Sequence, residues 1–238
     1  LPITTEAGIF LSEYMIYLSL IAIIYISFVA YAQTDMKKLI AYSSVAHMGF
    51  VTLGIFLVFH LLGNNLNAAV IGLEGAIIQM ISHGLISAAL FFCIGIIYKH
   101  SKSRLLKDNY GVVTFMPLFS FLMLFFLMAN SGLPGTSGFV GEFLVITSAL
   151  GSNIIIGFLA ATSLLLSASY SLKLGKNVLF GENTQNIQGY RECAINEKFV
   201  LGVLVIFILY LGLTPDYLFK IIDHTTINLI DSINLGRT

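Results

Sequence analysis

Six apolar runs fill most of this chain, and each is long enough to cross a lipid bilayer. They cover roughly residues 10–33, 38–60, 70–98, 112–150, 154–177 and 197–222, whereas a transmembrane helix needs only ~20 residues. Inside a bilayer the backbone must satisfy its own hydrogen bonds, so each run is expected to be helical. Only 10% of the residues are charged, which leaves little material for a soluble domain. The sequence therefore predicts an all-α polytopic membrane protein with about six transmembrane helices.

Basic residues are concentrated in alternate connections between these runs. Ten of the twelve lie in the connections after the first, third and fifth runs: Lys37, Lys38, Lys99, Lys102, Arg104, Lys107, Lys173, Lys176, Arg191 and Lys198. The other two connections, HLLGNNLN and GSN, hold none. If each run crosses once, the basic connections share one side, which the positive-inside rule assigns to the cytoplasm or the mitochondrial matrix. Both ends of the chain are then expected on the opposite side.

The fourth run, residues 112–150, is much longer than one crossing needs and contains the segment GLPGTSGFVGEF. Pro134 cannot donate an N–H to a helix, and the glycines around it favour non-helical backbone. Two helices here would move the last basic connection to the wrong side. We therefore expect one crossing made of two half-helices, about 115–131 and 139–150, with SGLPGTSG unwound between them. An ordinary Gly/Pro kink or an interhelical loop is the alternative.

Glu142 follows this break and lies inside the apolar run. A carboxylate at membrane depth is costly unless it is paired, protonated or hydrated, so such a residue is a candidate functional group. Its expected place is the first turn of the second half-helix, where a helix N-terminus favours an anion. Broken helices of this kind hold ions in membrane transporters. Glu142 is therefore a candidate proton carrier, and a salt bridge that only holds helices together is the alternative.

Two histidines lie near the middle of other spans. His83 occurs in QMISHGLISAALFF and His47 in AYSSVAHMGF. Histidine exchanges protons near neutral pH, so both side chains are candidates for a proton relay, with a structural role as the alternative. Lys38 precedes His47 by nine residues, or roughly 13 Å along a helix. Lys37 and Lys38 are therefore expected at the basic-side mouth of a polar path that continues through the histidines to Glu142.

The remaining polar groups carry weaker signals. Glu74 and Glu13 lie near the ends of their spans and are expected at the membrane interface. Cys93 and Cys193 have neither the number nor the spacing of a metal site or a disulfide framework, which favours structural roles. No phosphate loop, metal motif or dinucleotide fingerprint occurs, and the net charge of zero does not indicate nucleic-acid binding. Four glycines in the spans are expected to permit close helix packing: Gly49, Gly54, Gly84 and Gly95.

Three segments, QTDMKKLIAYSSVAHMGF, IQMISHGLISAALFF and NSGLPGTSGFVGEF, resemble segments of NADH dehydrogenase subunit 4, one of the three antiporter-like membrane subunits of respiratory complex I. The resemblance covers about residues 1–215, with the motifs in the same order. Subunits 2 and 5 fit less well, since their broken helix typically carries a lysine. The resemblance implies fourteen helices in the family fold, with two inverted five-helix repeats. The six runs then match helices nine to fourteen: residues 1–177 as the second repeat, and 178–238 as a basic-side loop, the last transmembrane helix and a C-terminal tail.

The resemblance also implies roles for the candidate residues. Glu142 matches the broken-helix glutamate facing the far-side half-channel, His83 and His47 match members of the central polar axis, and Lys37 or Lys38 matches the basic residue at the matrix-side entry. The implied function is proton translocation in the membrane arm of NADH:ubiquinone oxidoreductase, driven by quinone reduction. This chain would carry no redox chemistry, with FMN, iron–sulfur clusters and ubiquinone in other subunits.

The first repeat of the family is not among these residues, so we expect a split subunit in which a second chain supplies helices one to eight. Further expected partners are subunits 2 and 5 and a membrane lipid such as cardiolipin, with no nucleic acid. The expected location is the mitochondrial inner membrane, with the bacterial plasma membrane as the alternative. Two other functions stay open: a subunit of a multisubunit Na+/H+ antiporter or membrane-bound hydrogenase, and a structural membrane-arm subunit that does not pump.

Overall fold

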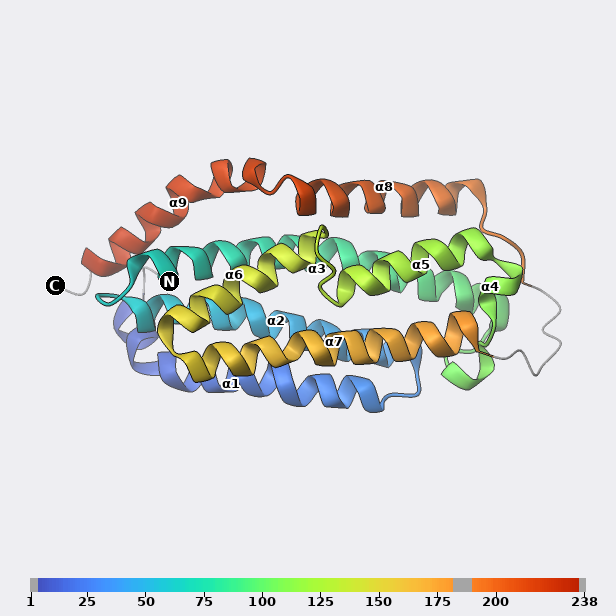
Figure 1. The fold of residues 1–238 in the computed structure, drawn as a ribbon, viewed down its shortest axis with the longest axis horizontal. Coiled ribbons are helices and arrows are strands. Elements are labelled where there is room, and N and C mark those ends of the chain that lie inside the picture. The colour runs from blue at the N-terminus through green and yellow to red at the C-terminus, as the bar shows by residue number, and fades with distance from the viewer. Residues whose placement is uncertain (1–3, 182–189, 236–238) are drawn as a thin grey trace.

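The computed structural model describes residues 4–181 and 190–235, and within these ranges the chain folds as a bundle of helices (Figure 1). The bounds are α1 Thr5–Ala32, α2 Met36–Leu61, α3 Leu66–Ser101, η2 Leu106–Asp108, α4 Val112–Phe115, α5 Pro117–Asn130, α6 Ser137–Ser152, α7 Ile154–Phe180, α8 Ile195–Leu213 and α9 Asp216–Leu235. Part of the expected basic-side loop (182–189), the end of the tail (236–238) and residues 1–3 lie outside the described residues.

Five helices, α1, α2, α3, α7 and α8, are each long and apolar enough to cross a membrane. They run along the long axis of the molecule (Figure 1). The shorter apolar helices α5 and α6 follow one another along the same axis and together make one further crossing. The prediction of an all-α polytopic membrane protein, with six crossings and a broken fourth, is therefore confirmed.

The break between α5 and α6 occupies residues 131–136. Gly132 and Gly135 have φ angles of 76° and 91°, in the left-handed region that glycine enters without a steric penalty. The Leu133 amide donates to the Met128 carbonyl oxygen at 3.1 Å, which satisfies one of the last carbonyls of α5. The bounds of both half-helices differ from the expected ones by at most two residues. Local glycine and proline chemistry thus determines where the crossing unwinds.

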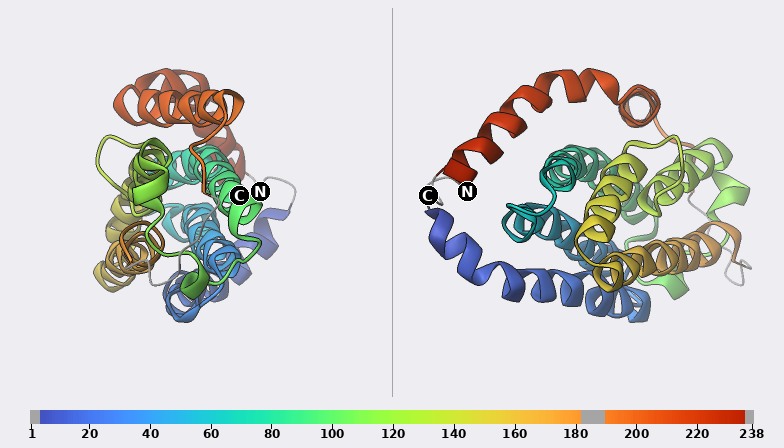
Figure 2. Two further views of the ribbon diagram at one scale, coloured as in Figure 1. Left: turned by 90° about the vertical axis from the view of Figure 1, so that its right-hand side faces the viewer. Right: turned by 60° about the vertical axis from the view of Figure 1, so that its left-hand side comes forward.

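The expected sixth segment, 197–222, is wrong at its C-terminal end. α8 stops at Leu213, and Pro215, which has no N–H to donate, separates it from α9. α9 is amphipathic, and one face is buried: Thr226, Ile230 and Ile233. Figure 2 shows α9 leading from α8 towards the end of the bundle where α1 begins. The described part of the tail is therefore a helix that covers the bundle.

The connections rich in basic residues meet at one end of the bundle, the right-hand end in Figure 1. The Met36 amide donates to the Arg104 carbonyl oxygen at 2.9 Å, which joins the connection before α2 to the one after α3. Lys99 forms an ion pair with Glu197 of α8 at 3.0 Å. The alternation of basic and uncharged connections along the chain therefore corresponds to the two ends of the folded bundle.

Close helix contacts explain two of the four glycines expected to permit packing. A Cβ added to Gly49 would lie 2.9 Å from an α1 side chain, and one added to Gly54 would lie 2.5 Å from an α3 carbonyl oxygen. A Cβ added to Gly84 or Gly95 would have no neighbour within 4 Å. The packing prediction is therefore confirmed for Gly49 and Gly54; Gly84 and Gly95 face away from the other described helices, and for them it stays a prediction.

Candidate functional site

Glu142 lies in the second turn of α6 and is 2% exposed. Its neighbour Gly141 packs against α3 so closely that a Cβ there would lie 2.8 Å from the Gln79 Cα atom. This contact brings the carboxylate to the buried junction of α2, α3 and α6. The expected place in the first turn is wrong, because α6 begins at Ser137. Helix N-termini stabilise anions only within the first turn, so the carboxylate needs another partner.

That partner is His47 on α2. His47 Nδ1 lies 2.8 Å from Glu142 Oε1, and the side chains are 6% and 3% exposed. An ionised carboxylate only accepts hydrogen bonds, so Nδ1 is the donor. Gln79 Nε2 also donates to this oxygen, at 3.3 Å. The other oxygen, Oε2, is buried without a hydrogen-bond partner among the described residues. The site is thus a buried pair with one unsatisfied acceptor.

The second ring nitrogen of His47 faces Tyr170 of α7, with the hydroxyl 3.1 Å from Nε2. Tyr170 is 1% exposed, and the side chains of Asn130 and Ser43 lie near its hydroxyl. Because Nδ1 donates to the carboxylate, Nε2 accepts from the hydroxyl when the ring is neutral and donates to it when the ring is protonated. The imidazole therefore connects a hydroxyl on one side to a carboxylate on the other.

Sequence reasoning did not select Tyr170, although α7 carries a signal that points to it. Four polar residues at helical spacing form a stripe that is at most 5% exposed: Ser163, Ser167, Tyr170 and Ser171. In a membrane helix such a stripe marks the face turned towards protein. Tyr170 is the one aromatic member, and its hydroxyl reaches furthest from α7. Helical periodicity applied to the polar residues inside this span predicts the buried face that carries Tyr170.

His83 of α3 lies beside His47, with ring centroids 5.6 Å apart and planes inclined by 37°. A small cavity of about 10 Å³ is lined by both histidines, Gln79, Asn130 and Glu142, among others. That volume is close to the minimum for one water molecule, and the lining offers it several polar partners. The structure thus brings together three of the five candidates, His47, His83 and Glu142.

Lys37 and Lys38 lie apart from this junction, exposed in the first turn of α2 at the basic end. Their backbone amides donate to the Asp35 carboxylate at 2.8 and 3.1 Å, which caps the helix. His47 follows two to three turns along the same helix, and the buried Ser43 lies between them. The two lysines therefore occupy the expected mouth position without contacting Glu142.

Other ionisable and thiol groups were singled out less strongly. Glu74 is 8% exposed and accepts a 3.4 Å hydrogen bond from Thr226 of α9, so α9 covers its carboxyl group; its place at the membrane interface stays a prediction. Glu13 is exposed on α1. Cys93 and Cys193 are buried free thiols. In the described part of the chain, no three His, Cys, Asp or Glu side chains form a group that would hold a metal ion.

Comparisons with known proteins identify the family of the chain. The family model for NADH:quinone oxidoreductase/Mrp antiporter transmembrane proteins matches residues 1–167. NADH-ubiquinone oxidoreductase chain 4 of Chondrus crispus is 40% identical over 98% of this chain and 46% of the relative. NADH-quinone oxidoreductase subunit M of Rhodobacter capsulatus is 41% identical over 98% of this chain and 44% of the relative.

A solved chain of respiratory complex I from Thermus thermophilus superposes with a TM-score of 0.86 and 25% identity, over 96% of this chain and 46% of that one. The chain spans about half the length of the relatives it matches. These matches confirm the family that the three sequence motifs indicated. The chain belongs to the NADH:quinone oxidoreductase/Mrp antiporter transmembrane family, on the branch of complex I subunit 4.

Proposed function

We propose that this chain carries the C-terminal half of a proton channel in the membrane arm of NADH:ubiquinone oxidoreductase. The observation that carries the proposal is the buried His47–Glu142 pair beside a broken crossing, with a polar cavity next to it. A buried ionisable pair in a membrane protein is expensive to maintain and marks ion pathways. Relatives named as chain 4 and subunit M of this oxidoreductase support the assignment of the complex.

The proton steps follow from the hydrogen-bond geometry. A proton enters at the basic end near Lys38 or Lys37 and reaches the histidines through buried polar side chains. When His47 binds it at Nε2, the proton on Nδ1 passes to Glu142 Oε1 across 2.8 Å, and the imidazole is neutral again. His83 exchanges protons with His47 through the small cavity. Glu142 then releases its proton towards the far side and returns to the carboxylate form, and His47 moves its remaining proton from Nε2 back to Nδ1 by tautomer exchange before the next proton arrives.

The proposals on cofactors, membrane and partners concern the whole enzyme and not this chain alone. As a subunit of an H+-translocating NADH:ubiquinone reductase, the chain has no redox chemistry of its own, and FMN, iron–sulfur clusters and ubiquinone are held by other subunits. Its membrane is the mitochondrial inner membrane, or the plasma membrane in a bacterial enzyme; relatives in Chondrus crispus and Rhodobacter capsulatus are compatible with either. Its partners are the antiporter-like subunits 2 and 5 and membrane lipid such as cardiolipin.

We also propose that residues 1–177 form the second antiporter-like five-helix repeat, and that 178–238 form a basic-side loop, the last transmembrane helix and the C-terminal tail. The first half of the subunit, with helices one to eight, packs against this repeat, as a separate chain if the subunit is split. It supplies a lysine whose protonation changes during quinone reduction and drives protons towards His47. Crosslinking from α2 and α3 in the intact complex identifies the polypeptide that carries this lysine.

Replacing Glu142 with Gln tests the proposal. The amide keeps the shape of the carboxylate and still accepts a hydrogen bond from His47, so the complex is expected to assemble. It cannot bind and release a proton, so NADH-driven acidification in membrane vesicles should fall to near background. Glu13→Gln makes the same chemical change at an exposed position on α1 and should leave pumping unchanged. Normal pumping by the Glu142→Gln enzyme would rule out its role as a proton carrier.

Two rival functions predict different results in the same vesicles. A subunit of a Na+/H+ antiporter or membrane-bound hydrogenase would support its exchange or hydrogen chemistry without quinone-dependent NADH oxidation. The family as a whole includes Mrp antiporters, which is why this rival stays open. A purely structural subunit would retain both turnover and pumping after neutral replacements of Glu142, His83 and Lys38.

A further inference from the structure

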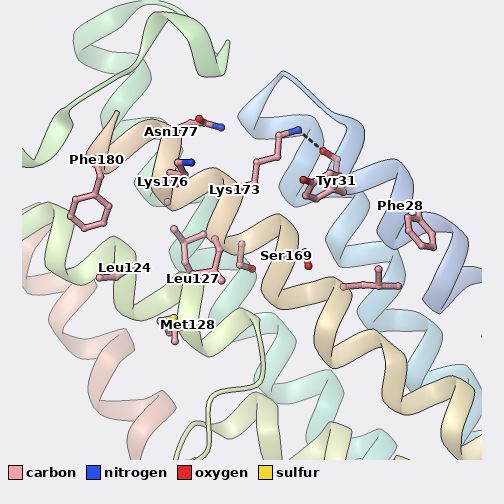
Figure 3. Close-up of a pocket in the computed structure, with 14 residues that line it drawn as sticks. Phe28, Tyr31, Leu124, Leu127, Met128, Ser169, Lys173, Lys176, Asn177 and Phe180 are labelled. Carbon is pink, nitrogen blue, oxygen red and sulfur yellow. Dashed lines mark hydrogen bonds between the residues drawn. The ribbon is translucent and has the colours of Figure 1, made fainter. Parts of the chain in front are cut away.

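A groove of about 730 Å³ lies on the outside of the bundle between α1, α5 and α7 (Figure 3). It is separate from the buried junction of His47 and Glu142, none of whose residues line it. Its walls are helices that cross the membrane, and its upper end lies where α7 approaches the basic end of the bundle. The groove therefore extends from the apolar depth of the bilayer towards the headgroup level.

The deeper part of the groove is apolar. Leu124, Leu127 and Met128 of α5 line it opposite Leu172 of α7. Gly175 of α7 also lines the groove, and a Cβ there would be 3.3 Å from Leu127 Cδ1. A larger residue at Gly175 would fill part of the space, so the glycine keeps the groove open. Its shape and chemistry suit a hydrocarbon chain.

The end of the groove nearest the basic side carries two cations one turn apart on α7. Lys173 donates to the carbonyl oxygens of Tyr31 and Gln33, and its ammonium group lies 4.9 Å from the centroid of the Tyr31 ring. An ammonium group has three N–H donors, so one is still available. Lys176 is exposed at the rim, and the Asn177 side chain lies nearby (Figure 3). The two lysines thus place positive charge at the basic-side end of the groove, with Lys173 on the α1 side of α7 (Figure 3).

From this arrangement we infer that the groove is a binding site for an anionic phospholipid of the basic-side leaflet. The phosphate contacts Lys176, the free donor of Lys173 and Asn177, and an acyl chain lies along α5 and Leu172. A free phosphate ion would leave the apolar floor empty, and an apolar partner helix would bury the Lys176 charge without compensation. Each basic residue near such a surface contributes about 1 kcal/mol, or about fivefold in affinity. The site does not depend on the proton path, so it can be tested independently.

The chain contains no tryptophan, so one introduced tryptophan reports on the groove alone. We would place it at Leu172 in the groove, with Phe180→Trp as a second reporter at the rim. The full chain is reconstituted in phosphatidylcholine vesicles that contain a minor fraction of acyl-brominated phosphatidylglycerol or acyl-brominated phosphatidylcholine. Bromine quenches tryptophan fluorescence at contact, so the ratio of the two quenching efficiencies measures the preference of the site for anionic lipid.

The inference predicts stronger quenching by the brominated anionic lipid for either reporter. Lys176→Gln should lower the anionic preference about fivefold. Lys107→Gln, which removes an exposed charge at the same end of the bundle but outside the groove, should leave it unchanged. Equal quenching by the two lipids, or a preference that survives Lys176→Gln together with Lys173→Gln, would overturn the inference. Absence of quenching by both lipids would also overturn it, since a second copy or another polypeptide would then cover the groove.

Discussion

Replacing His47 with Leu measures how much the buried pair stabilises the junction of α2, α3 and α6. Nδ1 of His47 lies 2.8 Å from Glu142 Oε1, and the side chains are 6% and 3% exposed, so solvent cannot replace the lost partner. Only the 3.3 Å hydrogen bond from Gln79 remains. Removing the partner of a buried carboxylate leaves its charge uncompensated, which costs about 3–5 kcal/mol of unfolding free energy. The His47→Leu chain should lose stability in that range.

Glu142→Gln should cost much less, about 1 kcal/mol, because a neutral amide still accepts the hydrogen bond from Nδ1. In that background His47→Leu removes only a neutral hydrogen bond and leaves an amide unpaired, at about 1–2 kcal/mol. The cost of the same histidine substitution is therefore expected to differ between the two backgrounds by about 1–4 kcal/mol, which is the coupling free energy of the pair.

The coupling is measured by unfolding the full chain in mixed micelles with sodium dodecyl sulfate and following its helical circular dichroism. The two single variants, the double variant and the parent chain form the cycle, with Glu13→Gln as the exposed control. Additive losses, within about 0.5 kcal/mol, would refute the reasoning that the two side chains stabilise each other. A larger loss for Glu142→Gln than for His47→Leu would refute the argument that the unpaired charge is the costly species.

Tyr170→Phe keeps the buried ring but removes the hydroxyl 3.1 Å from His47 Nε2. We expect a stability loss of about 1 kcal/mol and fewer protons pumped per NADH oxidised in vesicles. Pumping at the parental level would exclude Tyr170 from the proton path. Gly141→Val places a Cβ 2.8 Å from the Gln79 Cα atom, so micellar unfolding should show a loss of about 1–3 kcal/mol from overpacking. Gly84→Val, where a Cβ has no neighbour within 4 Å, is the matched control, and equal effects at both glycines would contradict the packing argument.

The broken crossing was predictable because its causes are local. Pro134 and the surrounding glycines interrupt a helix wherever they occur, and the alternation of basic connections left only one crossing for residues 112–150. The end of the last span was not predicted correctly, although Pro215 carries the same kind of signal. Averaging hydropathy over a window extended the apolar run past that proline into α9. A helix-breaking residue such as Pro215 therefore predicts the end of a helix better than the mean hydropathy of the run does.

The partner of Glu142 could not be deduced from local pattern. His47 and Glu142 are 95 residues apart in the chain, and sequence reasoning placed both on one polar path without joining them. The nearest hydrogen-bond partner of the Glu142 carboxylate is nevertheless a histidine of the same chain. The burial of the Glu74 carboxylate could not be deduced from local pattern either, because it depends on α9, which packs over α3 from far along the chain.

The sequence alone determined the number of crossings, their alternating direction and the depth of the candidate residues. These properties follow from the lengths of the apolar runs, the charges of the loops and the GLPGTSG break, which depend only on neighbouring residues and the bilayer. Which side chains touch was decided by tertiary packing alone. The close approach of Gly141 to Gln79 sets the rotation of α6 relative to α3, and that rotation directs Glu142 towards His47, Gln79 and the cavity. Distances of 2.8–3.3 Å depend on the relative rotation of several helices, which no single segment specifies.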